Sequence, residues 1–204
     1  MAYFPFMIDI SNQKCLVVGG GKIAFHKVKL LSGFDVQIKV VGTEICRELS
    51  ELSEIEIVQR EFMDSDLEEM DFVIAATDDE KLNDHISGLC KQRKILVNVV
   101  DRKEACSFIF PAIIQEKNLL VAVSTGGQSP AAAAYVKKKI KNHIPEYYGE
   151  MIETLGEYRE YVLEHVDTAR ERKAIFNKLL KYGDSHEGKI EPEIVRPMIA
   201  EVSE

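Results

Sequence analysis

Three consecutive glycines, Gly19, Gly20 and Gly21, follow an apolar run that is typical of a buried strand. Gly19, Gly21 and Ala24 match the pattern G-x-G-x-x-A. In this pattern the first glycine, Gly19, permits a tight turn, and the second, Gly21, lets the backbone approach a pyrophosphate. Ala24 permits a helix to pack closely on the strand, and the free N–H groups at the start of that helix attract an anion. An ordinary glycine-rich turn would have the same pattern. Its position between a strand and a helix favours dinucleotide binding.

A carboxylate, Asp101, directly follows the apolar run ILVNVV and precedes the basic pair Arg102 and Lys103. Aspartate often forms turns because its side chain bonds the backbone that follows it. The carboxyl ends of parallel strands, however, border the ligand in doubly wound folds, and a carboxylate there can accept a proton. We favour the catalytic interpretation, with the two basic side chains as candidate partners for an anion.

Two further segments should lie at the same edge of the sheet. Glu44 follows the second predicted strand at about the distance expected for a residue that contacts the adenosine ribose. It could equally be a first-turn acid of the next helix. No arginine sits beside Gly42 to receive a phosphate, which favours NAD over NADP. The loop AATDD, with Ala76 and Thr77, leaves the fourth predicted strand beside the ligand, although Thr77 or Asp78 could also simply cap the next helix.

The segment STGGQSP, Ser124 to Pro130, combines small residues with a helix start. Ser129 is a suitable N-cap and Pro130 suits the first helical position. Small residues leave room for a large flat ligand, and backbone N–H groups at a helix start favour anions. A well-capped helix preceded by a flexible loop explains the same residues, and both interpretations stay open. The lysines that follow indicate a solvated helix face: Lys137, Lys138, Lys139 and Lys141.

These residues need a scaffold, and the first hundred residues alternate strand and helix patterns. Strands are expected in KCLVVGGG, an apolar run that ends in glycines, and in DVQIKVV, EIEIVQREF, DFVIAAT and KILVNVV. Helices are expected in KIAFHKVKLLSG, with Gly33 as its stop, and in DDEKLNDHISGLCKQR. Such alternation predicts an α/β fold with a Rossmann-like parallel sheet that is covered on both faces.

The pattern changes after Asp101. SFIFPAIIQEKNLLVAVST indicates a β-hairpin that turns at Gln115–Asn118, and a helix follows it. From Pro145 onward the chain is helical and charged, with two apolar stripes. We therefore expect an NAD-binding domain at 1–105, a short central segment at 106–144, and a C-terminal helical domain at 145–204. The stripes are Met151, Leu155, Tyr158, Val162 and Val166, then Ile175, Phe176, Leu179 and Leu180.

Composition excludes several classes of protein. The 204 residues carry 26 basic and 34 acidic groups, a formal charge of −8, which argues against a general nucleic-acid binder. The four cysteines and five histidines show no ligand spacing, so we expect no permanent metal site. No apolar run approaches the roughly 20 residues that span a membrane, and no signal peptide is evident. We expect a soluble, cytoplasmic protein.

Four segments together resemble the precorrin-2 dehydrogenase / sirohydrochlorin ferrochelatase family, which includes the dehydrogenase part of siroheme synthase and shorter stand-alone enzymes. The resemblance runs from Tyr3 to about Ile144, and the tail from Pro145 matches only in being helical. Several motifs in one order are far more specific than a glycine pattern alone. The segments are YFPFMIDISNQKCLVVGGGKIAFHKVKLL, VIAATDDEKLN, VNVVDRKEACSFIFPAII and LLVAVSTGGQSPAAAAYVKKKI.

The resemblance implies an NAD-dependent oxidation of precorrin-2 to sirohydrochlorin by a homodimer that is built through the central segment. By position, Asp101 aligns with the family's catalytic aspartate. The family's substrate carries several carboxylates, which suits anion binding at Arg102 and at the STGGQSP segment. Some relatives also insert iron, and a non-catalytic regulator that senses NAD is a further alternative. The matching cofactor contacts are Lys22, Ile23, Thr43 and Glu44, and the substrate contacts expected in the central segment are Ser124, Thr125, Gly126, Gly127 and Ser129.

Overall fold

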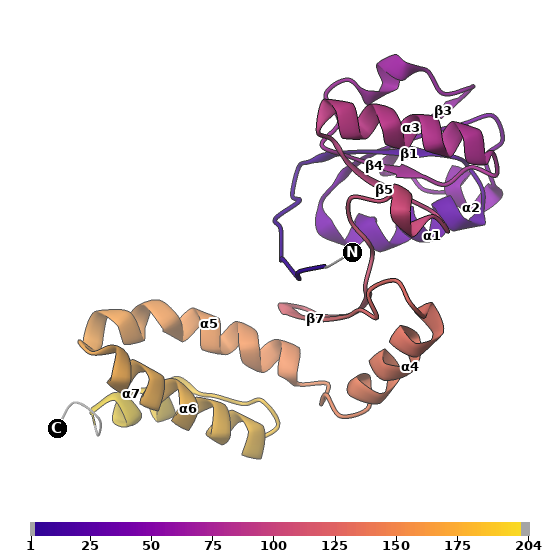
Figure 1. Ribbon diagram of the computed structural model, residues 1–204. Coiled ribbons are helices and arrows are strands. Elements are labelled where there is room, and N and C mark those ends of the chain that lie inside the picture. Colours follow the sequence, from indigo (N-terminus) through magenta and orange to yellow (C-terminus); the bar gives the residue numbers. More distant parts are fainter. Residues whose placement is uncertain (1–2, 201–204) are drawn as a thin grey trace. The chain divides into compact units, whose positions relative to one another are not determined.

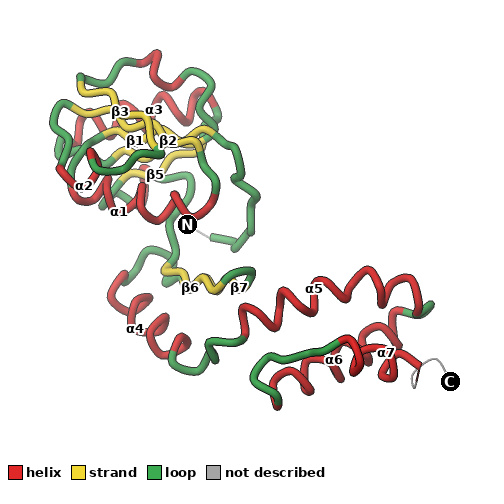
Figure 2. The backbone as a smooth tube through the Cα atoms, turned by 180° about the vertical axis from the view of Figure 1, so that it is seen from behind, coloured by secondary structure: helices red, strands yellow, loops and turns green. Residues whose placement is uncertain are grey.

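A computed structural model describes residues 3–200 of the chain (Figures 1 and 2). They divide into two units, Met1–Phe110 and Pro111–Glu204. The central segment expected at 106–144 therefore begins in the first unit and continues in the second. The division into three domains stays a prediction.

The first unit is built on a five-stranded parallel sheet in the order β3-β2-β1-β4-β5. Parallel neighbours need crossover connections, and helices supply most of them. Strand order reverses between β1 and β4, the point at which doubly wound folds bind ligands. The predicted Rossmann-like sheet is confirmed. Its strands are β1 (Lys14–Val18), β2 (Gln37–Gly42), β3 (Ile55–Gln59), β4 (Phe72–Ala75) and β5 (Leu96–Val99), and its helices are α1 (Lys22–Leu31), α2 (Arg47–Ser50) and α3 (Glu80–Arg93).

Each face of this sheet has its own core, because successive side chains of a strand point to opposite faces. Leu16 and Val18 of β1 pack with Ile86 and Cys90 of α3. The intervening residues of β1 face the other side, where Val28 of α1 is fully buried. Figure 1 accordingly shows α3 on one face of the sheet and α1 and α2 on the other. Burial on both faces explains why the central strands β1 and β4 are almost continuously apolar.

The end of α1 differs from the prediction. The helix ends at Leu31, and the 3-10 turn η1 (Ser32–Phe34) includes Gly33. Asp35, with a φ of 53°, takes the left-handed conformation that closes the turn. Aspartate tolerates this conformation better than most residues, so glycine was not needed at the stop. Two more 3-10 turns, η2 (Asp64–Leu67) and η3 (Lys103–Ala105), complete the unit.

The second unit begins with the predicted hairpin, β6 (Ala112–Glu116) and β7 (Leu119–Val123), whose antiparallel pairing is confirmed (Figure 2). Its turn is shorter than predicted: the strands extend through Gln115 and Glu116, and only Lys117 and Asn118 connect them. Lys117 has a φ of 51°, as the primed turns of two-residue hairpins require. Helix α4 (Pro130–Lys141) packs on this hairpin, and Lys141 forms an ion pair with Glu116.

Three helices follow: α5 (Tyr148–His165), α6 (Ala169–Ser185) and α7 (Pro192–Ala200). Their shared core contains the first predicted stripe, with Met151 and Val162 buried. The second stripe is correct at Ile175 and Leu179 but wrong at Leu180, which is 43% exposed. A helix with few partners buries only a narrow stripe. Over residues 3–200, no helix combines the length and the apolar character that crossing a membrane demands.

Candidate functional site

The first glycine of the motif joins two loops at the switch point of the sheet. Gly19 has a φ of +113°, and its N–H donates to the Val41 carbonyl at 2.8 Å. A Cβ at this position would lie 2.4 Å from the carbonyl oxygen of Ala76, in the loop after β4. Both the backbone conformation and the close approach therefore require glycine.

The second and third glycines have opposite surroundings. The Gly20 carbonyl accepts the Cys46 N–H at 2.7 Å, and a Cβ on Gly20 would lie 2.0 Å from the Glu44 carbonyl oxygen. Around Gly21, by contrast, a Cβ would meet no atom within 4 Å. Gly21 is the exposed N-cap of α1, without a side-chain cap. Open backbone at a helix start fits the pyrophosphate of a dinucleotide.

The other expected cofactor contacts lie around this opening. Lys22 and Ile23 are exposed in the first turn of α1, and Ile23 shows 48% of its surface. Thr43 and Glu44 are exposed directly after β2, with the Thr43 carbonyl held by Gln59 Nε2 at 3.1 Å. All four residues stand at the carboxyl edge of the sheet. Their contacts to NAD stay predictions.

The loop after β4 is held by a residue that sequence reasoning missed, the buried Asn83 of α3. Its side-chain oxygen accepts from the Thr77 hydroxyl at 2.8 Å, and its Nδ2 donates to the Thr77 carbonyl at 2.9 Å. Asp79, and neither Thr77 nor Asp78, caps α3, since its side chain accepts from Lys81 N and Leu82 N. The network fixes the Ala76–Thr77 backbone beside Gly19. An amide one turn inside a polar helix gives no distinctive sequence signal.

Asp101 lies in a turn just beyond β5. The last ladder bond runs from Val100 N to the Ala75 carbonyl at 3.0 Å, and Arg102 N closes the turn on the Val99 carbonyl at 3.4 Å. Asp101 itself is exposed, with a φ of 57°. Among residues 3–200 its carboxylate has no hydrogen-bond or ion-pair partner. A free, solvent-facing carboxylate at this edge can receive a proton.

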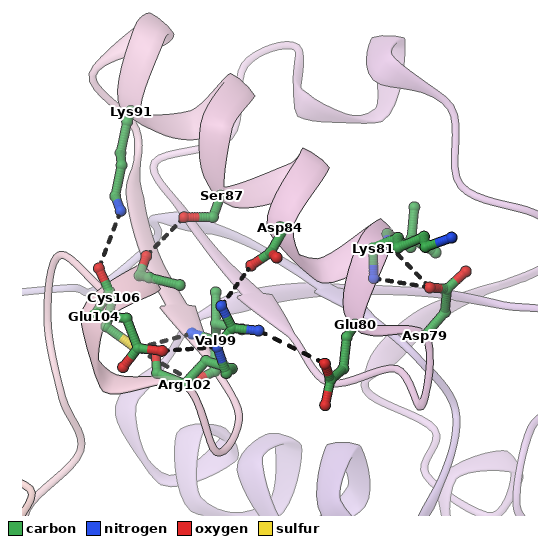
Figure 3. Close-up of polar contacts among 12 residues, drawn as sticks. Asp79, Glu80, Lys81, Asp84, Ser87, Lys91, Val99, Arg102, Glu104 and Cys106 are labelled. Atoms are coloured by element: carbon green, nitrogen blue, oxygen red, sulfur yellow. Dashed lines mark hydrogen bonds and ion pairs between the residues drawn. The ribbon is translucent and has the colours of Figure 1, made fainter.

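Arg102 turns its guanidinium toward α3 rather than into open space (Figure 3). Its Nε lies 2.8 Å from Glu104, and its terminal nitrogens lie 3.3 Å from Asp84 and 3.8 Å from Glu80. The three carboxylates raise the pKa of the guanidinium. Arg102 thereby links the Asp101 turn to α3. Its predicted contact with substrate stays a prediction.

Two further side chains beside Asp101 escaped the sequence analysis. Lys27 of α1 is partly buried, with Nζ 4.1 Å from the ring centroid of Phe110. Burial lowers its pKa, while the Asp101 carboxylate acts in the opposite direction. Cys106 is 8% exposed and lies against the turn. Neither residue belongs to a motif with a recognised spacing, so only the folded chain reveals them.

The STGGQSP segment belongs to the second unit, where its own side chains close the loop. Thr125 Oγ1 accepts from Ser129 N at 3.1 Å, and Ser124 Oγ accepts from Gly126 N at 3.1 Å. The predicted N-cap is confirmed, because Ser129 Oγ accepts from Ala132 N at 3.1 Å. Gly126 and Gly127 have φ values of 61° and 75°. The loop is ordered by local bonds, and substrate binding there stays a prediction.

Two known protein families match parts of this chain. Residues 6–112 match a family described as "Putative NAD(P)-binding". The match covers more than half of the chain and contains the glycine loop and the Asp101 turn. The chain belongs to this family. Residues 118–143, which include the STGGQSP segment, match a second model, described as "Sirohaem biosynthesis protein central".

Curated relatives of the chain include siroheme synthases. The one from Thioalkalivibrio sulfidiphilus is 41% identical over 184 residues, and the one from Actinobacillus succinogenes is 36% identical over 205 residues. These alignments cover 89% and 95% of this chain but only 38% and 43% of the relatives. The chain thus spans about two fifths of their length.

A solved structure supports the fold along the whole chain. The protein described as "SirC, precorrin-2 dehydrogenase" matches with a TM-score of 0.71 at 21% identity. The match covers 98% of this chain and 99% of that one. At this identity the likeness establishes the fold, including the small hairpin sheet and the helices that follow it.

Proposed function

We propose that the chain catalyses the NAD-dependent oxidation of precorrin-2 to sirohydrochlorin. The observation that carries the proposal is that the open backbone at Gly21 and the unpaired carboxylate of Asp101 lie at one edge of one sheet. Membership of an NAD(P)-binding family supports the cofactor. The siroheme synthase relatives and the fold shared with SirC support the substrate.

In this reaction precorrin-2 loses two electrons and two protons: one C–H bond breaks with its electron pair, and one proton leaves separately. NAD, when bound, supplies the acceptor for the hydride. Gly21 and the first turn of α1 would hold its pyrophosphate by their N–H groups. Asp101 accepts the proton on a carboxylate oxygen and passes it to water, which its exposure allows. The products are sirohydrochlorin, NADH and one proton.

The substrate carries carboxylates, and the chain offers two places for them. The loop Ser124–Ser129 leads into the N-terminus of α4, where the positive end of the helix dipole attracts an anion, and we assign it to substrate binding. Arg102 is the second candidate, although Glu80, Asp84 and Glu104 already surround its guanidinium. We therefore expect Arg102 to contribute more to the position of the Asp101 turn than to the affinity for substrate.

A second copy of the chain is the proposed partner. On α4, Tyr135 is 62% exposed and Val136 is 41% exposed. Among the residues that the structure describes, the adjacent β6–β7 sheet has two strands, so its edges are available for pairing with a further strand. Light scattering should report a dimer for the wild type and a monomer for Tyr135→Lys. A monomeric wild type at micromolar concentration would contradict this assembly.

The function is tested with purified protein, precorrin-2 and NAD by following the absorbance of NADH and sirohydrochlorin. Asp101→Asn keeps the left-handed turn, because asparagine tolerates it, but removes the proton acceptor. We expect it to bind NAD normally and to lose about 100- to 10,000-fold in turnover. Asp35→Asn is the matched control, an exposed aspartate with a φ of 53° at the opposite edge of the sheet. Wild-type turnover in Asp101→Asn would contradict the mechanism.

A further inference from the structure

Asp101 is positioned by its backbone alone. No side-chain bond restrains its carboxylate among residues 3–200, and it stands in a left-handed turn that is costly for a residue other than glycine. The hydrogen bond that closes the turn, from Arg102 N to the Val99 carbonyl, is long at 3.4 Å. Other contacts must therefore hold the turn if the carboxylate is to face the reacting atoms reproducibly.

The thiol of Cys106 supplies those contacts from inside the protein. Its Sγ lies 3.2 Å from the Val99 carbonyl and 3.3 Å from the Arg102 carbonyl, so the S–H proton can bond either end of the turn. The same sulfur accepts the Val99 N–H at 3.1 Å and lies 3.6 Å from Asn98 Nδ2. Figure 3 draws these contacts among Cys106, Val99 and Arg102 as dashed lines. One side chain thus bridges the residues that flank Asp101.

The outer side of the turn is held by contacts that do not reach its interior. Arg102 pairs with carboxylates of α3 and η3, and Ser87 Oγ donates to the Ala105 carbonyl at 2.7 Å. These contacts anchor Arg102 and the segment after it. Cys106 is the residue whose side chain bonds both the strand end and the exit of the turn.

We propose that Cys106 is a positioning residue for catalysis, whose thiol holds the Val99–Arg102 turn and thereby aims the Asp101 carboxylate. This inference rests on the proposed function, because it gives Cys106 a role only if Asp101 takes part in the reaction. The thiol itself undergoes no chemistry. Its contribution is geometric, and a displacement of about 1 Å at a catalytic group can lower a rate by about a hundredfold.

The test compares Cys106→Ala, Cys106→Val and Cys106→Ser with the wild type in single-turnover oxidation of precorrin-2. Alanine and valine remove the sulfur bonds; alanine leaves a small void, whereas valine, which is somewhat larger than cysteine, leaves none. We expect both to lower the single-turnover rate about 10- to 100-fold while the Kd for NAD stays unchanged. Serine restores a donor and an acceptor and should recover the larger part of the loss.

Cys90→Ala is the matched control. Cys90 is fully buried in the same core as Cys106, but its thiol has no hydrogen-bond partner among residues 3–200. Its truncation should lower the melting temperature and leave the rate unchanged. If Cys90→Ala lowers the rate as much as Cys106→Ala, general loosening of the core explains the effect and the inference fails.

Failure of the inference is distinguishable from failure of the function. An inactive Asp101→Asn together with a fully active Cys106→Val overturns the positioning role alone. A fully active Asp101→Asn overturns the proposed mechanism, whatever Cys106 does. If Cys106→Ala does not fold, the valine and serine variants still decide the question: a valine rate equal to the serine rate contradicts the role of the thiol.

Discussion

Gly21→Ala should separate the binding of NAD from the stability of the fold. A methyl group at Gly21 meets no atom within 4 Å, and the φ of −83° suits any L-residue. Alanine is less favourable than glycine at an N-cap, which destabilises the folded state. It also lowers the conformational entropy of the unfolded chain, which stabilises the folded state, and each effect is about 1 kcal/mol or less. We therefore expect the free energy of unfolding to stay within about 1 kcal/mol of the wild type.

Gly21→Ala should instead lower the affinity for NAD. A methyl group at the point of closest backbone approach displaces the pyrophosphate and loses hydrogen bonds to a charged group, worth about 1.5–3 kcal/mol. That loss corresponds to a Kd for NAD about 10- to 150-fold weaker. Isothermal titration calorimetry measures the Kd, and thermal unfolding measures the stability of the same sample.

Gly20→Ala serves as the contrast, because we expect it to lower the stability of the fold itself. Its Cβ would lie 2.0 Å from the Glu44 carbonyl oxygen, so the backbone must shift. Such overpacking costs about 1–3 kcal/mol of stability before any ligand is added. A Gly21→Ala protein that binds NAD as tightly as the wild type would refute the assignment of the glycine loop to the pyrophosphate.

Further predictions concern the pH dependence of stability and the loop that Asn83 holds. Burial lowers the pKa of Lys27, so its protonated form opposes folding, and wild-type stability should rise as the pH increases through the folded pKa. Lys27→Met should lack this rise when unfolding is measured at pH 7 and pH 10. Hydrogen bonds from Arg60 and from Met63 N lower the pKa of the Asp66 carboxyl in the folded protein. The ionised Asp66 therefore stabilises the fold above about pH 4, and this stabilisation is lost as the pH falls through the lowered folded pKa. Asp66→Asn should melt several degrees lower at pH 7 and approach the wild type in acid; an equal deficit at both values contradicts the ion pair. Asn83→Ala should weaken NAD binding through the released Thr77 loop, and calorimetry showing an unchanged Kd would refute this.

The order of strands and helices was predictable because its signals are local. An apolar run buried on both faces is continuous, whereas a helix alternates with a period near four residues. The N-cap Ser129 followed from the residue types that satisfy free N–H groups. Leu180, Gly33 and the hairpin turn were mispredicted because several local patterns there fit almost equally well. Tertiary packing and backbone twist selected among them.

The side chains that hold the site were not predictable in the same way. Arg102 meets Asp84 of α3, eighteen positions earlier in the chain, and Asn83 meets Thr77 across a loop. Cys106 bonds a turn whose conformation depends on where β5 ends against β4. A hydrogen bond needs its donor and acceptor atoms within about 3 Å of each other. Only the folded chain brings the atoms of these pairs that close.

The amino-acid sequence by itself determined that a glycine loop opens the first helix and that an aspartate follows the last parallel strand, because residue type and order act directly on the local backbone. The tertiary structure decided that Gly21 is open while Gly20 is enclosed, and that Asp101 is unpaired while Arg102 is surrounded by carboxylates. These differences between neighbours arise from segments distant in the chain. Distances between such segments exist only in the folded molecule.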